Sequence, residues 1–199
     1  EAACVRLHGA NRLGSNSTAE CLVWGGIAGG EAGRYCSEAP QAAPVPESRV
    51  LAEHKRIFDD LLSRNGSENL YDIRRELRSN MDVNAGVFRT GEELSRGLEK
   101  IQSLRKRYAG IRVADKSTVY NTNLYHALEV ANLLDLAEVT VKGALTRTES
   151  RGGHARRDYP TRDDVNWLKH TLAFCSEQGP RLDYKPVTIT TWKPEERKY

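Results

Sequence analysis

The stretch Thr122–Thr148 constrains the fold of this chain more than any other part of the sequence. Apolar residues recur along it at a helical spacing and also fall on its other faces; they are Leu124, Leu128, Ala131, Leu133, Leu134, Leu136, Ala137, Val139, Val141 and Leu145. A surface helix has a single apolar stripe, whereas an apolar surface this wide requires burial on most sides. The sequence therefore predicts that Thr122–Thr148 is the central helix of a helical bundle.

Shorter amphipathic helices are predicted before this central helix. Apolar residues recur at the helical period over Val50–Leu62 and again over Leu70–Met81. Thr90 and Glu93 form a capping box at the start of a further helix, which Gly110 ends. The predicted fold class is mainly α, a bundle of three to four helices.

The C-terminal segment has a different character. A short helix is expected after Asp163, and Leu172–Phe174 and Val187–Trp192 have the composition of strands. We expect the two strands to form a small β element, either by pairing with each other or by lying along another domain.

Composition excludes several classes of function. The 199 residues are 29% charged and 39% hydrophobic, with a net charge of +3, which is ordinary for a soluble chain of one or two small domains. No apolar run approaches the roughly 20 residues of a membrane span, so we expect no direct membrane insertion. Basic clusters lack interleaved aromatic residues, which argues against nucleic acid as a partner. The four cysteines form no Cys-x-x-Cys pair, so no metal site is predicted, and they are interpreted as reduced, mostly packed thiols.

The N-terminal stretch Glu1–Thr18 has the features of half an active site. Gly9 and Gly14 permit backbone angles that side chains forbid, and Ser15, Asn16 and Ser17 are each suitable N-caps for a helix that ends near Cys36; His8 is either an acid–base group or a brace for the turn. The N–H groups at a helix start favour an anion. Arg12 adds a planar cation that binds a carboxylate through two hydrogen bonds.

Motifs along the whole chain resemble the flavoprotein subunit family of succinate dehydrogenase and fumarate reductase, to which L-aspartate oxidase is closely related. The first is the C-terminal flavin-binding motif of that family. The motifs, in order, are His8-Gly-Ala-Asn-Arg-Leu-Gly-Ser-Asn-Ser17, Asn84-Ala-Gly-Val-Phe-Arg-Thr-Gly-Glu92, Glu149-Ser-Arg-Gly-Gly-His154, Arg157-Asp-Tyr-Pro160, Arg162-Asp-Asp164, Asn166-Trp-Leu-Lys-His170 and Glu196-Arg-Lys-Tyr199.

The resemblance implies an FAD-dependent oxidoreductase that interconverts succinate and fumarate by hydride transfer. It implies that Arg12 holds one substrate carboxylate, and that Glu1, Asn16, Ser17 and Thr18 contact FAD, although many family members have Leu at the position of Thr18. The catalytic residues of the family lie before Glu1, so none is expected in this chain. We therefore expect a C-terminal fragment that neither holds FAD tightly nor turns over alone.

The implied domains follow from the same resemblance and from the proline-rich connector Glu38–Pro46. Residues 1–38 are expected to carry the last helix of an FAD-binding α/β domain, 39–47 a linker, 48–150 the helical bundle and 151–199 a C-terminal extension with short strands. The implied partners are an iron–sulfur subunit and membrane anchor subunits, which would place the protein in the cytoplasm, peripherally on the inner face of the membrane.

Two alternatives remain open. Glu20-Cys-Leu-Val23 after the first motif favours L-aspartate oxidase, whereas the motifs at 162–170 and the C-terminal end favour the dehydrogenase branch. The non-enzyme alternative is a helical module that docks an electron-transfer partner. A second polar group, formed by Arg151, His154, Arg156 and Arg157, is interpreted as a structural docking segment, with direct contact to cofactor or substrate as the alternative.

Overall fold

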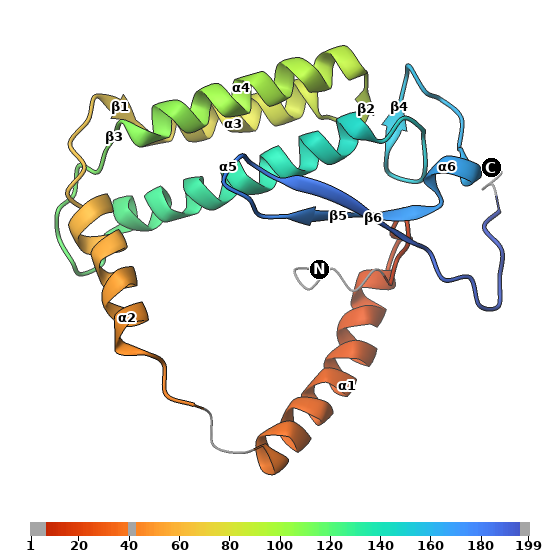
Figure 1. Cartoon of the computed structure of the whole chain (residues 1–199), viewed down its shortest axis with the longest axis horizontal. Coiled ribbons are helices and arrows are strands. Elements are labelled where there is room, and N and C mark those ends of the chain that lie inside the picture. The colour runs from red at the N-terminus through yellow and green to blue at the C-terminus, as the bar shows by residue number, and fades with distance from the viewer. Residues whose placement is uncertain (1–6, 40–42, 196–199) are drawn as a thin grey trace. The chain divides into compact units, whose positions relative to one another are not determined.

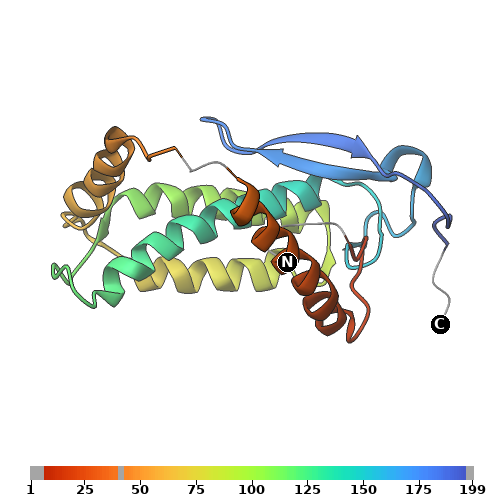
Figure 2. The same ribbon diagram turned by 90° about the horizontal axis from the view of Figure 1, so that it is seen from below.

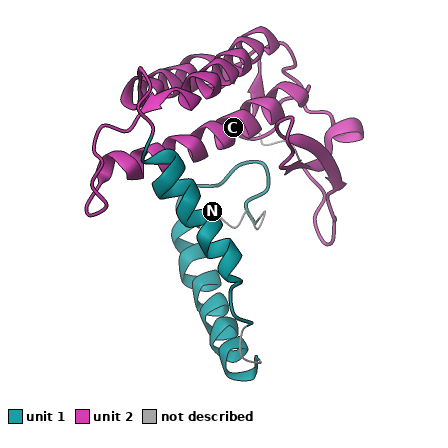
Figure 3. Cartoon of the chain, turned by 60° about the vertical axis from the view of Figure 1, so that its left-hand side comes forward, with its two compact units in different colours: residues 1–63 teal, residues 64–199 magenta. Residues whose placement is uncertain are grey.

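The computed structural model describes residues 7–39 and 43–195, and the chain divides into two compact units, Glu1–Ser63 and Arg64–Tyr199 (Figure 3). Within each unit the residues contact one another more than they contact the other unit. The domain boundaries expected from the sequence, at residues 38, 47 and 150, remain a prediction.

The first unit consists of helices. Helix α1 spans Asn16–Glu38, and α2, Glu47–His54, continues into the π-helix η1, Lys55–Leu61. The predicted helix over Val50–Leu62 is thus confirmed in extent, but its winding was not foreseen: the Leu62 N–H bonds to the Ile57 carbonyl at 2.9 Å, five residues back.

Helix α1 buries no residue within this chain. Its two cysteines, Cys21 and Cys36, are exposed, and so is Cys175. The expectation of mostly packed thiols is therefore wrong for these three, because no other part of the described chain covers the surfaces on which they lie. Cys4 lies outside the described residues.

The second unit is a three-helix bundle of α3 (Leu70–Asn84), α4 (Gly91–Ala109) and α5 (Thr122–Thr146), which lie side by side in Figures 1 and 2. Its core consists of apolar residues from all three helices, among them Ile73, Leu77, Leu94, Ile101, Leu104, Val130, Leu134 and Val141. The predicted mainly helical fold is confirmed. No helix within the described ranges is both long and apolar enough to cross a membrane.

Helix α5 is less enclosed than expected. Leu136 is 64% exposed and lines an open pocket between α5 and α3. The predicted capping box at the start of α4 is present: the Thr90 Oγ1 accepts from the Glu93 N–H at 3.2 Å, and Gly110 is the C-cap.

Two short parallel strand pairs tie the loops to the bundle: β1 (Glu68–Asn69) pairs with β3 (Ile111–Arg112), and β2 (Phe88–Arg89) with β4 (Ala155–Arg156). Beside β1, the backbone at Gly66 lies close to the backbone at Gly110. A Cβ atom at Gly66 would lie 2.0 Å from the Gly110 carbonyl oxygen, so this position requires glycine.

The C-terminal segment begins with the single-turn helix α6 (Asp164–Trp167), which Asp163 caps through its side chain. Strands β5 (Lys169–Phe174) and β6 (Arg181–Pro186) then form an antiparallel hairpin that contacts α5 (Figure 1). The predicted strand at Leu172–Phe174 is confirmed, but the one at Val187–Trp192 is wrong. The turn before Arg181 sets the register, and β5 begins opposite Pro186, so residues 187–192 have no partner strand in the described chain.

Candidate functional site

Residues 8–20 form a turn that is closed by one side-chain contact at the start of α1. His8 Nε2 donates to Glu20 Oε2 at 2.5 Å, and both side chains are largely buried, with 21% and 14% exposure. The hydrogen bond from His8, with the charges of His8 and Arg12, holds the pKa of Glu20 below its usual range. Of the two roles considered for His8, this geometry favours the brace.

At the start of α1, the Asn16 N–H donates to the Leu13 carbonyl at 3.3 Å. Ser15 is the N-cap in a left-handed conformation (φ +65°), and no side chain caps the helix among the described residues. The predicted side-chain cap is thus wrong, because a left-handed N-cap departs from the extended backbone that this hydrogen bond requires. The Thr18 N–H bonds to the Ser15 carbonyl at 3.1 Å.

The predicted site residues of this turn are close together in the sequence, and most of them are exposed. Arg12, Asn16 and Thr18 are exposed and Ser17 is half-buried. Glu1, the remaining predicted residue, lies outside the described residues. The turn therefore presents one guanidinium and a helix start to solvent, an arrangement suited to a carboxylate or another anionic group.

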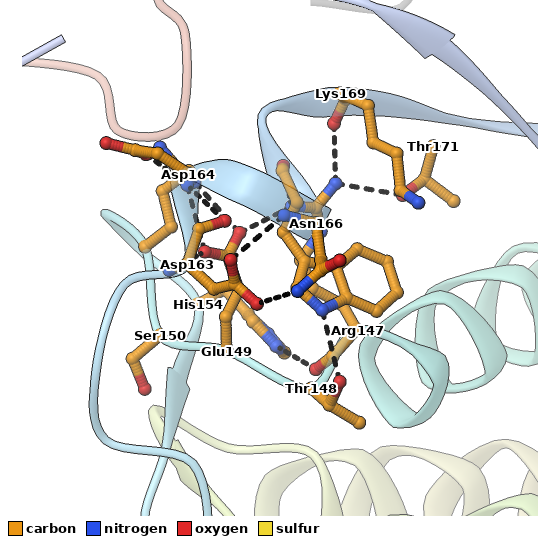
Figure 4. Close-up of polar contacts among 12 residues, drawn as sticks. Arg147, Thr148, Glu149, Ser150, His154, Asp163, Asp164, Asn166, Lys169 and Thr171 are labelled. Atoms are coloured by element: carbon orange, nitrogen blue, oxygen red, sulfur yellow. Dashed lines mark hydrogen bonds and ion pairs between the residues drawn. The ribbon is translucent and has the colours of Figure 1, made fainter.

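A second polar group lies at the end of α5, in the other compact unit, and has Glu149 at its centre (Figure 4). This carboxylate is fully buried and accepts hydrogen bonds from Arg147 Nη1 at 2.6 Å, from Arg151 Nε and Nη2 at 2.8 and 2.9 Å, and from the Asp163 N–H at 2.8 Å. Burial alone would raise the pKa of Glu149, but these hydrogen bonds outweigh it and lower the pKa below the usual range.

Arg147 extends this group toward the hairpin. Its Nη2 donates to the carbonyl of Lys169 at 2.6 Å and to Thr171 Oγ1 at 3.2 Å, and its guanidinium stacks 5.0 Å from the centre of the Trp167 ring. The interactions of this one arginine therefore join the end of α5 to α6 and to the first strand of the hairpin.

Arg156 closes the C-terminal end of α5. The side chain is buried, and its Nη1 donates to the carbonyls of Ala144 and Leu145 at 3.0 Å, while Nε and Nη2 each donate to Asp158 at 2.7 Å. A cation at this end is favoured by the helix dipole. The paired guanidinium holds the pKa of Asp158 far below its usual range.

His154 is neutral in this environment. Burial, together with the charges of three neighbouring arginines, lowers its pKa, against a smaller opposing effect of the Arg147 carbonyl. Its Nε2 lies 3.2 Å from that carbonyl and its Nδ1 lies 3.1 Å from Arg89 Nη1. Since a carbonyl only accepts and a guanidinium only donates, the proton is on Nε2.

These contacts favour the structural interpretation of the second polar group. Arg151 and Arg156 are bound to carboxylates of the same unit, and the guanidinium of exposed Arg157 lies 5.5 Å from the centre of the Phe88 ring. Within the described ranges, no cluster of three or more His, Cys, Asp or Glu side chains is arranged to hold a metal ion.

Sequence reasoning named Glu20 and Glu149 within motifs but assigned neither acid a role. Glu20 is twelve residues from His8, a spacing that has no meaning until the turn is folded. Glu149 had a detectable signal, since it is a single acid between two arginines directly after a long apolar helix.

The fold is a three-helix bundle with a C-terminal hairpin, and comparisons with known proteins give its family. The family model described as fumarate reductase flavoprotein C-term matches residues 74–199. The succinate dehydrogenase flavoprotein subunit of Rickettsia bellii is 46% identical over 98% of this chain, and the fumarate reductase flavoprotein subunit of Haemophilus influenzae is 43% identical over all of it.

Solved structures agree. A chain from E. coli quinol fumarate reductase with a mutation in FrdA matches 96% of this chain, with a TM-score of 0.88 and 39% identity. The chain thus belongs to the succinate dehydrogenase and fumarate reductase flavoprotein family. It spans about a third of the length of these relatives, 33% in each case.

Proposed function

We propose that this chain is the C-terminal part of an FAD-dependent oxidoreductase that interconverts succinate and fumarate. The observation that carries the proposal is the exposed turn of residues 8–20, which presents Arg12 beside the start of α1. Membership of the flavoprotein family supports the same function.

Arg12 would bind one carboxylate of the dianionic substrate. A guanidinium holds a carboxylate through two parallel hydrogen bonds, which fix its orientation as well as its position. Binding that orients the reacting carbon–hydrogen bond lowers the barrier by removing rotational freedom in advance.

The start of α1 fits the anionic edge of a reduced flavin. No side chain within the described residues caps this helix, and Asn16, Ser17 and Thr18 lie around its first turn. We assign these three residues, with Glu1, to FAD, which when bound supplies the hydride donor or acceptor. The positive end of the helix dipole would stabilise negative charge there.

The remaining proposals concern partners and location. The flavoprotein would work with an iron–sulfur subunit and membrane anchor subunits, and would lie in the cytoplasm on the inner face of the membrane. The matched structures include a quinol-fumarate reductase with menaquinol and an Sdh1 complex with UQ1 from Mycobacterium smegmatis, which support an assembly of this kind. The non-enzyme alternative, a helical module that docks an electron-transfer partner, applies to the helical bundle taken by itself.

The experiment that tests the proposal is a side-by-side assay of the full-length subunit with succinate and with L-aspartate, using an artificial electron acceptor. L-aspartate carries an ammonium that requires an acceptor in the pocket, and the acid of the described turn, Glu20, is already bound to His8. Oxidation of succinate, with malonate as a competitor, is expected. Preferential oxidation of L-aspartate would move the assignment to the oxidase.

A further inference from the structure

An open pocket of about 300 Å³ lies beside the C-terminal end of α5, within the second compact unit. Its lining contains three basic side chains, Arg89, Arg147 and His154, and no acidic side chain. Apolar residues of α5 and of both hairpin strands complete the walls; they are Val139, Ala144, Ala173 and Leu182. A pocket of this size and lining is suited to a small molecule that has one anionic group and some hydrocarbon.

Arg89 is the basic group of this pocket whose charge is not balanced. Its Nε donates to the Gly86 carbonyl at 2.7 Å, and its Nη1 donates to His154 Nδ1 at 3.1 Å. Both partners are neutral. Among the residues that the structure describes, Arg89 forms no ion pair and its Nη2 has no hydrogen-bond partner. Burial lowers the pKa of Arg89, and a bound anion would offset this cost of holding the charge.

Thr171 supplies a second free donor at the pocket. Its Oγ1 accepts from Arg147 Nη2 at 3.2 Å (Figure 4), and its own proton is donated to no residue of the described ranges. A hydroxyl both accepts and donates, so this proton is available to a ligand. Arg147 is already paired, since its Nη1 donates to Glu149 Oε1 at 2.6 Å.

We propose that this pocket binds one small aliphatic carboxylate, whose oxygens accept from Arg89 Nη2 and from the Thr171 hydroxyl. One unbalanced guanidinium matches one negative charge, and the apolar walls favour a short hydrocarbon chain over inorganic phosphate. Arg89 lies on β2 and Thr171 on β5, so the bound carboxylate would join the strand before α4 to the hairpin. This inference does not depend on the proposed oxidoreductase activity.

The test is a calorimetric titration of the 199-residue chain with sodium butyrate at constant ionic strength. Saturable one-to-one binding is expected, together with a thermal midpoint that rises with the butyrate concentration, because a ligand of the folded state stabilises that state. Inorganic phosphate should bind at least about 10-fold more weakly, since it buries no hydrocarbon against the walls.

Two substitutions identify the donors. Arg89→Gln should weaken butyrate binding by about 10- to 100-fold, because it removes a hydrogen bond from a charged group. Thr171→Val keeps the size of the side chain and should weaken binding by roughly 5-fold through the loss of a neutral donor; it also tests the site if Arg89→Gln does not fold. Arg75→Gln is the matched control, since Arg75 is exposed on α3 and pairs with Asp72. Its affinity should equal that of wild type.

Absence of saturable butyrate binding would overturn the proposal, and so would wild-type affinity in Arg89→Gln and Thr171→Val proteins that keep the native circular dichroism spectrum. Equal affinity for phosphate would also overturn it, because attraction of charge alone would then explain the binding. The full-length subunit should bind butyrate in the same Arg89-dependent way. Binding by the 199-residue chain alone would mean that a carboxylate elsewhere in the subunit fills the pocket, and would overturn the assignment to a free ligand.

Discussion

Arg151 binds Glu149 through two parallel hydrogen bonds, from Nε to Oε1 at 2.8 Å and from Nη2 to Oε2 at 2.9 Å. Arg151 Nη2 also reaches Asp164 at 2.7 Å, so the pair connects the loop after α5 with the start of α6. An ionised carboxylate can accept about four hydrogen bonds, so the four donors around the buried Glu149 satisfy it. The pair is a structural centre of the C-terminal segment, and its removal has predictable consequences.

Glu149→Gln should destabilise the chain by about 3 kcal/mol, because it removes the buried carboxylate that Arg147 and Arg151 share. The change preserves the size of the side chain, so the effect reports charge and hydrogen bonding and not a cavity. Urea unfolding followed by circular dichroism measures it as a lower midpoint.

The control for this change is Glu92→Gln. Glu92 also pairs with an arginine, Arg96, but its side chain is 81% exposed. Exposed pairs contribute little, so this variant should stay within about 0.5 kcal/mol of wild type. Equal effects of the two substitutions would contradict the role given to Glu149.

The contribution of Glu149 should depend on pH in one direction. Its pKa is lowered in the folded chain by hydrogen bonds that outweigh the effect of burial, so its stabilisation is fully present above the pKa of an unfolded glutamate, about 4.3. That stabilisation is lost as the pH falls through the lower folded pKa.

The stability difference between wild type and Glu149→Gln should therefore be constant from about pH 6 to 8 and shrink below about pH 4.3. The difference is the informative quantity, because Asp158, Asp163 and Asp164 also have lowered pKa values and destabilise both proteins in acid. A difference that grows in acid would contradict the assignment.

Replacement by alanine should lower the stability of the fold at one glycine, Gly66, and raise it at another, Gly143. At Gly66 the new Cβ would lie 2.0 Å from the Gly110 carbonyl oxygen, which is backbone and cannot easily move, so Gly66→Ala should cost about 2 kcal/mol or more. At Gly143, within α5, the Cβ meets nothing within 4 Å, and Gly143→Ala should stabilise by about 0.5–1 kcal/mol through helix propensity. Thermal unfolding of the two variants checks both signs.

The helices were predictable because their signals are local. The apolar period of α3 and the capping box of α4 each lie within one element, and the structure has both. The hairpin was harder, since β-branched composition favoured residues 187–192, whereas pairing is decided by the turn that precedes Arg181. The exposure of Leu136 on α5 depends on where two other helices pack, which no local pattern records.

The residues assigned to the site stay a prediction, and their contacts could not be predicted from the sequence. The glycines, Arg12 and the small polar residues at the start of α1 are close together in the sequence. The partner of His8 is not adjacent, and neither the left-handed Ser15 nor the hydrogen bonds of Glu149 to a backbone N–H fourteen residues away follow from a pattern. Contacts of this kind depend on the folded path of the chain.

The isolated 199-residue chain should be folded but colourless. Its bundle has a complete apolar core between α3, α4 and α5, whereas α1 has no buried residue against which a cofactor could pack. Circular dichroism should show a mainly helical protein, and purified material should lack flavin absorbance. A yellow preparation with one FAD per chain would mean that the cofactor site lies elsewhere than proposed.

Arg12→Lys in the full-length subunit should lower the kcat/KM for succinate by about two orders of magnitude while FAD content stays normal. Lysine keeps the charge but lacks the planar fork, and a lost hydrogen bond to a charged group costs roughly 2–3 kcal/mol. Arg34→Lys is the matched control: Arg34 lies near the other end of α1 and pairs with Glu31 and Glu38 at exposed positions. Its replacement should leave turnover unchanged. Normal turnover of succinate by the Arg12 variant would rule out the binding role, whereas a parallel loss of FAD would show that Arg12 supports the cofactor and not the substrate.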